Sequence, residues 1–322
     1  MRIICSLAIL VLTSSLAQSA CPPPGIIVRD ITADRFYIDA ASSVPDEAIL
    51  ARNKASLAAL DHNLYPIIKF SDAALTGDTG AAQCAIQLLI AEARGGGMLG
   101  TMSSRQAGYE RKWRTAGVAI AYLKVKRWAA PDARATIEPW LTSLALNVET
   151  DYGAPKEPNN HYYWAGLASA AVGTATGDGA LLAYARRAYL SGLESIQPDG
   201  VLPRELARKG RALSYHNYAL APLILMAELA AARGEDWYQL RDGAIHRLVA
   251  RTVSGIKDPS AFARLAGVPT VEIPTGGILG WLAFYRARFP RKAEGAPNGP
   301  FNYNWLGGNL TLIAAKGLRA SP

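Results

Sequence analysis

Helical periodicity is the feature that most constrains this chain. About ten stretches carry Ala and Leu at spacings of three and four residues, which is the pattern of an α-helix with a buried face. Gly, Pro and Asp separate these stretches, and the alternation typical of half-buried strands is nearly absent. They lie near residues 44–60, 80–94, 113–128, 132–149, 161–176, 179–196, 213–233, 236–254, 276–288 and 303–317.

This pattern predicts an all-α protein built from packed helix pairs. A bundle, a superhelix and a closed α/α toroid all satisfy it, because short links between helices make sequential helices neighbours. We find no strict internal repeat, which disfavours a solenoid of the tetratricopeptide kind.

The N-terminus reads as an export signal. Met1-Arg2 gives a short positive start, residues 3–16 are almost wholly apolar, and small residues occur over 17–20. We therefore expect residues 1–20 to be removed, and residues 21–322 to form one domain that is periplasmic or secreted. The residues before Cys21 make a poor lipobox, so a soluble product is expected rather than a lipoprotein. No later run is apolar and long enough to predict membrane insertion.

Charge and cysteines narrow the partners and the compartment. The formal net charge is +8, and the excess is spread along the chain, which favours an acidic partner. Nucleic acid is a poor candidate, because an exported chain without nucleic-acid motifs has little reason to meet it. Outside the signal only Cys21 and Cys84 remain. If paired, they would close a loop of about sixty residues and stabilise the fold by about 4 kcal/mol.

Several kinds of catalytic site are disfavoured. The histidines, His62, His161, His216 and His246, are scattered, and there is no HExxH motif or paired-cysteine spacing for a metal. A nucleophile elbow, a phosphate loop and a dinucleotide fingerprint are also missing from the sequence. We therefore expect acid–base chemistry with no metal and no cofactor.

The stretch "PNNHYYWAGL" at residues 158–167 has two readings. Asn159 or Asn160 can cap the helix that begins near His161, because an Asn side chain accepts from free backbone amides there. Two consecutive Asn exceed what a cap needs, however. His161 and Trp164 are three residues apart, so both would meet a ligand on one helical face.

A second stretch, "LPRELARKGRALSYHNYAL" at 202–220, follows the turn signal Pro-Asp-Gly at 198–200. It reads either as a solvated basic turn before a half-buried aromatic helix, or as part of a site with Arg208, Tyr215 and Tyr218. With the Asn-Asn-His stretch it supplies an amide, a guanidinium, an imidazole and a phenol. Removing a proton beside a carboxylate needs donors that neutralise the carboxylate, a base, and an acid for the leaving oxygen.

These motifs resemble those of the alginate lyases of polysaccharide lyase family 5. "NNHYYWAG" is similar to the family's Asn-Asn-His-x-x-Trp motif, and "ELARKGRALSYHNYAL" to its Arg-centred and Tyr-His-Asn-Tyr block. The segment from Cys84 to Lys124 and the Cys-Pro-rich N-terminus also resemble the family. The resemblance implies an incomplete α/α toroid and β-elimination at a uronic acid residue of an anionic polysaccharide, most strongly mannuronate-rich alginate.

The resemblance also implies roles for single residues. Asn160 and Arg208 would neutralise the uronate carboxylate, and Tyr215 would be the general acid at the glycosidic oxygen. Either Tyr215 or His161 would be the base, depending on the epimer at C5. The sugar subsites would be lined by Gln106, Tyr109, Trp113, Trp164 and Tyr218, the first two of which stand in a Gly-rich link over 93–113.

One departure from the family concerns the substrate. Its alginate-cleaving members usually carry a Lys- and Gly-containing lid soon after the N-terminal Cys, whereas residues 36–50 here contain no basic residue. Because lid contacts help to select the polymer, a lyase acting on polyglucuronate, hyaluronan or mixed uronates is the alternative.

Two readings outside lyase chemistry remain. An inverting glycoside hydrolase needs two carboxylates about 6.5–9.5 Å apart, and the nearest candidates, Glu157, Asp199 and Glu205, do not pair convincingly. A non-catalytic protein that binds acidic polysaccharide would need charge, but not a phenol beside an imidazole. We expect a monomer with an anionic polysaccharide as substrate.

Overall fold

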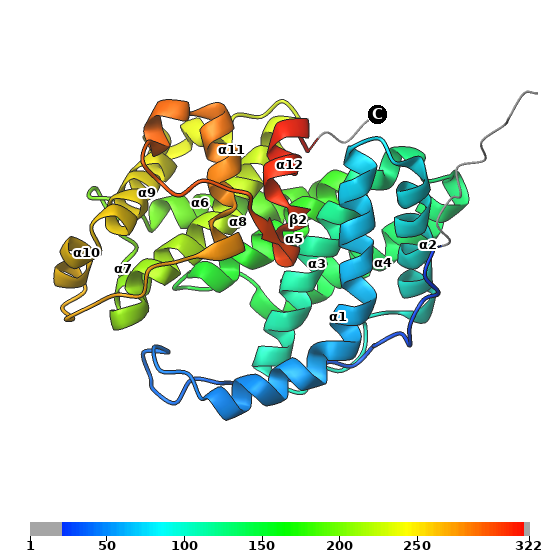
Figure 1. Cartoon of the computed structure of the whole chain (residues 1–322), viewed down its shortest axis with the longest axis horizontal. Coiled ribbons are helices and arrows are strands. Elements are labelled where there is room, and N and C mark those ends of the chain that lie inside the picture. The colour runs from blue at the N-terminus through cyan, green and yellow to red at the C-terminus, as the bar shows by residue number, and fades with distance from the viewer. Residues whose placement is uncertain (1–20, 319–322) are drawn as a thin grey trace, which may run out of the picture.

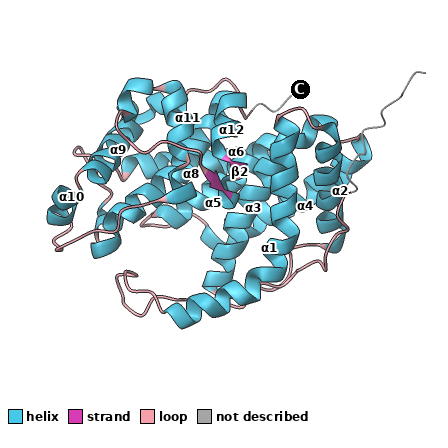
Figure 2. Cartoon of the chain, viewed as in Figure 1, coloured by secondary structure: helices cyan, strands magenta, loops and turns pink. Residues whose placement is uncertain are grey.

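The computed structural model describes residues 21–318, so the predicted signal peptide lies outside the described residues. Almost all regular structure is helical, with one two-stranded sheet (Figure 2), and this confirms the all-α prediction. The helices are α1 Glu47–Leu75, α2 Thr79–Gly95, α3 Arg105–Val125, α4 Pro131–Tyr152, α5 Asn160–Thr176, α6 Gly179–Glu194, α7 Pro203–Leu206, α8 Ala212–Ala232, α9 Leu240–Lys257, α10 Pro259–Leu265, α11 Trp281–Arg288 and α12 Leu310–Lys316. The strands β1 Asn302–Tyr303 and β2 Gly308–Asn309 pair antiparallel.

The helices pack as two concentric layers. The inner layer runs α1, α3, α5, α8 and α11, and each of these helices contacts the next. The outer layer runs α2, α4, α6 and α9 in the same way, while α2 covers α1 and α6 covers α5. Figure 1 shows α3, α5 and α8 at the centre of the molecule, with α1 and α2 towards one end and α9 and α10 towards the other. This is the expected incomplete α/α toroid.

The structure changes several helix boundaries. The helix expected over 44–60 continues to Leu75, through Pro66. The helix expected from residue 113 begins at Arg105, where the Ser104 side chain accepts hydrogen bonds from the next turn. The C-terminal stretch 303–317 is only partly helical, because a β-hairpin precedes α12. The prediction of a Gly-rich link over 93–113 is therefore wrong for its second half.

The N-terminal segment lies against the inner helices before α1 begins. The disulfide between Cys21 and Cys84, with 5.2 Å between the two Cα atoms, joins this segment to α2. Residues 35–46, which we call the lid, follow, and they form a bent blue loop below the body, next to the start of α1 (Figure 1). Asp39 closes the lid by accepting hydrogen bonds from the amides of Ser43 and Val44.

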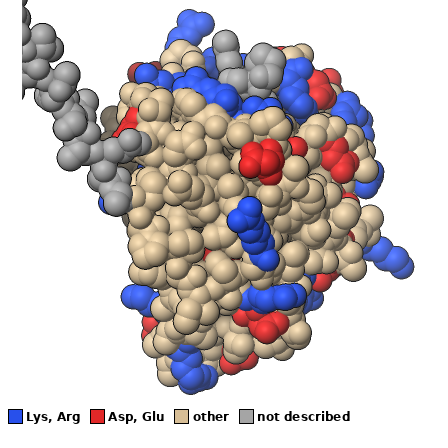
Figure 3. Space-filling model, turned by 90° about the vertical axis from the view of Figure 1, so that its right-hand side faces the viewer, with Lys and Arg blue, Asp and Glu red and all other residues tan. Residues whose placement is uncertain are grey.

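The middle of the face at the α2 and α4 end is mostly uncharged. Figure 3 shows only single charged side chains there, with more Lys and Arg towards its upper edge. No helix within residues 21–318 has the length and apolar character needed to cross a membrane.

Candidate active site

A cavity of about 440 Å³ opens where the lid faces the central helices. The lid contributes Arg35, Phe36, Tyr37 and Ser42 to its wall. The remaining lining residues come from the first turns of α3, the start of α5, the segment around α7 and α8, and the C-terminal hairpin. They are Arg105, Gln106, Tyr109, Trp113, Asn159, His161, Arg204, Arg208, Arg211, Ser214, Tyr215, Tyr218 and Trp305.

The cavity is positively charged. Its lining includes five arginines, at positions 35, 105, 204, 208 and 211, whereas none of the described residues that line it is an aspartate or a glutamate. Three of these arginines pair with carboxylates that do not line the cavity: the exposed Glu157 and Glu272, and the buried Glu205. An acidic ligand fits such a cavity, because arginines attract it and no carboxylate in the wall repels it.

The start of α5 resolves the two readings of the Asn-Asn-His stretch. Asn159 is the N-cap, and its side-chain oxygen accepts from the His161 amide at 3.0 Å. Asn160 is the first residue of the helix and does not cap it. The two asparagines therefore have separate environments, and the cap fixes where the His161 side chain leaves the helix.

Asn160 lies behind the cavity and does not line it. Its side chain is fully buried, and Nδ2 donates to both carboxylate oxygens of Glu205, at 3.0 and 3.1 Å. The Asn160 backbone amide donates to the same carboxylate at 2.9 Å. Burial raises the pKa of Glu205, while the Asn160 bonds and the charge of Arg208 oppose that rise. Asn160 was expected to contact a substrate carboxylate directly, but its Nδ2 is bound to Glu205 and does not reach the cavity.

Arg208 stands at the centre of the wall. Its Nη1 donates to the Ala41 carbonyl of the lid at 3.2 Å, and its Nε lies 3.8 Å from Oε2 of Glu205. The guanidinium carbon lies 4.8 Å from the centre of the Tyr215 ring. Arg208 therefore joins the lid, the buried Asn160–Glu205 pair and the phenol, with planar donors facing the cavity.

Tyr215, in the first turn of α8, is the phenol that faces Arg208. Its hydroxyl donates to the hydroxyl of Tyr37, 2.9 Å away in the lid. Burial raises the pKa of Tyr215 above its usual range, and Tyr37 raises it further. The phenol is therefore held protonated at neutral pH, as a general acid requires.

His161 contacts two residues of α3. Its ring stacks on Tyr109, with 3.8 Å between ring centres, and its Nδ1 lies 3.0 Å from Nζ of Lys112. Burial lowers the pKa of His161 well below its usual range, and the positive charges of Arg208 and Arg105 lower it further. A neutral imidazole results, with Nε2 as the ring nitrogen left for a ligand.

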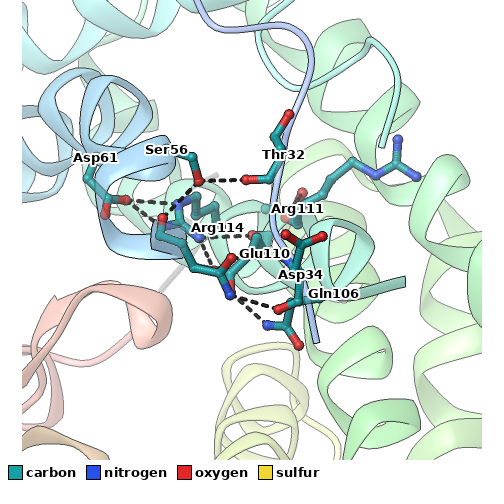
Figure 4. A network of polar contacts seen from close by, with 10 residues as sticks. Thr32, Asp34, Ser56, Asp61, Gln106, Glu110, Arg111 and Arg114 are labelled. Atoms are coloured by element: carbon teal, nitrogen blue, oxygen red, sulfur yellow. Dashed lines mark hydrogen bonds and ion pairs between the residues drawn. The ribbon is translucent and has the colours of Figure 1, made fainter. Parts of the chain in front are cut away.

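Gln106 is oriented by a chain of buried polar contacts (Figure 4). Its Nε2 donates to Glu110 at 2.9 Å, Glu110 pairs with Arg114 at 2.6 Å, and Arg114 pairs with Asp61 of α1 at 2.7 Å. Because the amide nitrogen is used in this chain, the Gln106 oxygen is the atom left to accept a hydrogen bond in the cavity.

Aromatic rings form one side of the cavity. Trp113 stacks on Trp305, with ring centres 4.3 Å apart, and packs against the edge of Tyr218. Gly117 permits this stack, because a Cβ there would lie 2.2 Å from the Asn304 carbonyl oxygen beside Trp305. Two flat rings and a phenol give a surface on which sugar rings can pack.

Trp164 differs from its expected placement on the ligand face. Its side chain is fully buried, and Nε1 donates to the Tyr218 carbonyl at 3.1 Å. Since α5 is buried on nearly every side, being three residues from His161 does not bring Trp164 to the cavity. It supports the helix that carries Tyr218.

A second, more open groove of about 760 Å³ lies beside α1. Its wall includes Asp61 and Asp72, which pair with Arg114 and Lys124. These carboxylates repel acidic ligands, so the groove is not a second candidate for the same ligand. Among residues 21–318 no three His, Cys, Asp or Glu side chains form a group that could hold a metal ion.

Sequence reasoning missed several residues of this site. Tyr37 lies in the stretch that drew attention only for lacking a lysine, and Trp305 is distant in sequence from every motif. Lys112 stands in "ERKWRTAG" within the family-like segment, where a lysine between aromatic residues was the available signal. Glu205 was considered only as a hydrolase carboxylate, but it is buried and bonded to Asn160.

Comparison with known proteins identifies the family. The sequence model described as alginate lyase matches residues 30–262. The chain is also 44% identical over 319 residues to a polysaccharide lyase of Stenotrophomonas maltophilia, with 97% of this chain and 96% of that protein covered. This chain belongs to the alginate lyase family. As a member of it, the chain is a polysaccharide lyase.

Other members of the alginate lyase family agree. An alginate lyase of Azotobacter vinelandii is 34% identical over 255 residues, which cover 74% of this chain and 67% of that protein. Among solved structures, a variant of alginate lyase A1-III in complex with a tetrasaccharide aligns with a TM-score of 0.80 at 23% identity, covering 92% of this chain and 86% of the other. The alginate lyase A1-III of Sphingomonas species A1 aligns with a TM-score of 0.74 at 24% identity, covering 92% and 86%. These two structures share the toroid fold.

Proposed function

We propose that this protein cleaves an anionic polyuronate by β-elimination, with mannuronate-rich alginate as its preferred substrate. The observation that carries the proposal is the meeting of His161, Arg208 and Tyr215 on one cavity that holds five arginines and no lining carboxylate among the described residues. Membership of the alginate lyase family supports the same substrate class.

Elimination begins with the acid group of the substrate. A proton on C5 of a uronate is only weakly acidic, and it becomes easier to remove when the neighbouring carboxylate is neutralised by planar donors. Arg208 is positioned to do this. Asn160 also neutralises the substrate carboxylate if its Nδ2 donates to that carboxylate in place of Glu205. While Asn160 stays bound to Glu205, the pair acts by holding Arg208 in position.

The proton transfers fall to the phenol and the imidazole. The base removes the C5 proton, the electron pair forms the C4–C5 double bond, and the C4–O glycosidic bond breaks. Tyr215 gives its proton to the leaving oxygen. The base is His161 where the C5 proton faces the imidazole. Where the C5 proton and the leaving oxygen lie on the same side of the sugar, Tyr215 would have to start as a phenolate, take the C5 proton and pass that proton to the leaving oxygen, and its raised pKa disfavours this route.

The alternative substrates are other polyuronates. The lid has no lysine between residues 36 and 50, and its groups at the cavity are the Arg35 guanidinium and the Tyr37 phenol. A lid of this composition also suits polyglucuronate or hyaluronan. A glycoside hydrolase is disfavoured, because hydrolysis needs carboxylates at the bond, and the cavity wall has none among the described residues.

We also propose that the protein works outside the cytoplasm, as a monomer of residues 21–322. The apolar N-terminal stretch and the Cys21–Cys84 disulfide support export to an oxidising compartment.

The test is an incubation of purified protein with polymannuronate, polyguluronate, polyglucuronate and hyaluronan. Ultraviolet absorbance from the new conjugated double bond reports elimination, and the ranking of initial rates gives the preferred polymer. New reducing ends without that absorbance would establish hydrolysis instead. Binding without either product would leave only a polysaccharide-binding protein.

A further inference from the structure

Lys112 is a buried lysine without an acidic partner. Its side chain is completely inaccessible to solvent, on the second turn of α3. It forms no ion pair with any residue in 21–318, and its one hydrogen-bonding contact there is Nδ1 of His161, at 3.0 Å. Buried lysines are nearly always paired, because an unpaired buried charge is costly. An exception beside a catalytic imidazole needs an explanation.

The surroundings of Nζ are aromatic. The rings of Tyr109, Trp113 and Tyr152 have their centres 4.6, 5.0 and 4.5 Å from Nζ. Such a cage weakly stabilises an ammonium, but it accepts no full hydrogen bond.

The nearby charges do not compensate for burial. The two carboxylates whose charges act on Lys112, Glu110 and Asp151, are bound to Arg114 and Arg111. Arg105 adds a positive charge that acts on Lys112, and Arg208 adds one that acts on His161. Burial lowers the pKa of Lys112 well below its usual range. The charge of Glu110 opposes this shift more strongly than Arg105 reinforces it, and Asp151 opposes it less, but burial outweighs them.

An amine and an imidazole in contact share one hydrogen bond, whose direction depends on the amine. An ammonium can only donate, and would leave the proton of His161 on Nε2. A neutral amine is the stronger base of the two, so it accepts from Nδ1 and leaves the Nε2 lone pair for the cavity. Only the second arrangement makes His161 a base.

We propose that Lys112 is a positioning residue that acts through His161: as a neutral amine it accepts the Nδ1 proton and presents Nε2 to the substrate as the base. The proposal rests on the proposed function only where it concerns catalysis, because the tautomer exists without substrate.

The hydrogen bond also provides a proton path. When the C5–H bond breaks, an Nε2–H bond forms on His161. The Nδ1–H bond then breaks and an Nζ–H bond forms on Lys112, so the imidazole ends neutral. The resulting ammonium lies within the three aromatic rings, which stabilise it. After the product leaves, Lys112 returns a proton to Nδ1, Nε2 releases one proton to water, and water reprotonates the Tyr215 phenolate, so no external reagent is consumed.

The first test uses the wild-type protein without substrate. Nitrogen-15 NMR of labelled histidines distinguishes the two neutral tautomers. At neutral pH we expect His161 to carry its proton on Nδ1, with Nε2 unprotonated. A proton on Nε2, or on both nitrogens, would overturn the proposal whether or not the protein cleaves any polyuronate.

The second test is a double-mutant cycle on kcat. Lys112→Met keeps the length and the burial but removes the proton acceptor, and we expect kcat to fall about 100-fold with little change in KM. His161 should then shift its proton to Nε2. In a His161→Ala background, Lys112→Met should cause no further loss. An equal loss in both backgrounds would mean that Lys112 has only a structural role.

Lys124→Met is the matched control. Lys124 is also a buried lysine of α3, but it pairs with Asp72 at 2.6 Å, far along the helix from His161. We expect this variant to lower the melting temperature and to keep kcat within a few-fold. If the wild type forms no unsaturated product from any polyuronate, the proposed function fails, while the tautomer measurement still decides the inference about Lys112.

Discussion

The phenol oxygens of Tyr215 and Tyr37 lie 2.9 Å apart, although 178 residues separate them in the chain. Tyr37 also accepts a hydrogen bond from Nη1 of Arg211. The lid therefore contacts the proposed general acid directly, in addition to covering the cavity. Its tyrosine orients the Tyr215 hydroxyl through a hydrogen bond and affects its ionisation.

Replacement of Tyr37 tests that contact. Tyr37→Phe removes the acceptor of the Tyr215 hydrogen bond and one of the causes that raise the pKa of Tyr215. A general acid works only while it is protonated, so activity falls as pH rises through its pKa. We expect the alkaline limb of the kcat/KM profile to move to lower pH, and kcat to fall about 10-fold through the lost hydrogen bond. An unmoved limb would contradict the coupling.

Tyr215→Phe should abolish turnover while leaving binding of the polymer largely intact. The ring and its contact with Arg208 remain, and only the proton donor is lost. Initial rates from ultraviolet absorbance check the loss of turnover, and calorimetry checks that the polymer still binds. Tyr162→Phe is the control, because Tyr162 is a buried tyrosine of α5 that packs on Tyr184 away from the cavity. Undiminished activity of Tyr215→Phe would mean that the acid has been misassigned.

Arg208→Lys should lower kcat/KM about 100-fold even though the positive charge is kept. A lysine ammonium lacks the planar pair of donors that matches a carboxylate, and it cannot hold the Ala41 carbonyl and the substrate together. Arg241→Lys, at an exposed pair with Glu194, is the matched control and should leave the rate unchanged. A loss of less than a few-fold in Arg208→Lys would remove this arginine from the mechanism.

The parts of the site that sequence predicted are those held in contiguous stretches. His161, Arg208 and Tyr215 come from two short motifs and line the cavity, whereas Asn160 of the same motifs is buried behind it against Glu205. Lys112 and Tyr37 reach the site only through packing, across 49 residues to His161 and 178 residues to Tyr215. No spacing rule covers such distances, so these two residues required the structure.

Some predicted helix boundaries were wrong for a related reason. A helix has a clear hydrophobic periodicity in its sequence when one of its faces is exposed to solvent. In the first turns of α3 the charged residues are buried, so charge does not mark a solvent-exposed face there; they are Glu110, Arg111, Lys112 and Arg114. The same holds for Trp164, which is buried because α5 is surrounded by other helices on nearly all sides. The short links and the many helices predicted packed helix pairs, and only the resemblance to the alginate lyases indicated the toroid.

Glu92, on α2, gives a prediction about stability rather than catalysis. Its side chain is 2% exposed, and neither carboxylate oxygen has a hydrogen-bond partner among the described residues. Burial raises the pKa of Glu92 to about 7. The fold therefore favours the protonated, neutral carboxyl.

The sign of the pH dependence follows from the two pKa values. Below the ordinary value of 4.5 the carboxyl is neutral in both folded and unfolded chains, and it has no effect on stability. Between 4.5 and about 7 the folded chain binds the extra proton, so the free energy of unfolding falls as pH rises. Above about pH 7 the carboxyl is ionised in both states, and the ionised Glu92 lowers the free energy of unfolding by its full amount, about 3 kcal/mol.

Glu92→Gln keeps the shape of the side chain and removes its charge. We expect the variant to be more stable than the wild type by up to about 3 kcal/mol at pH values above 7, and nearly equal to it below 4.5. Denaturant unfolding across this range measures the difference. Glu47→Gln, at an exposed position in the first turn of α1, controls for the loss of a carboxylate and should change stability by a few tenths of a kcal/mol. Parallel pH profiles for Glu92→Gln and the wild type would mean that the Glu92 carboxyl ionises in the folded protein as readily as in the unfolded chain.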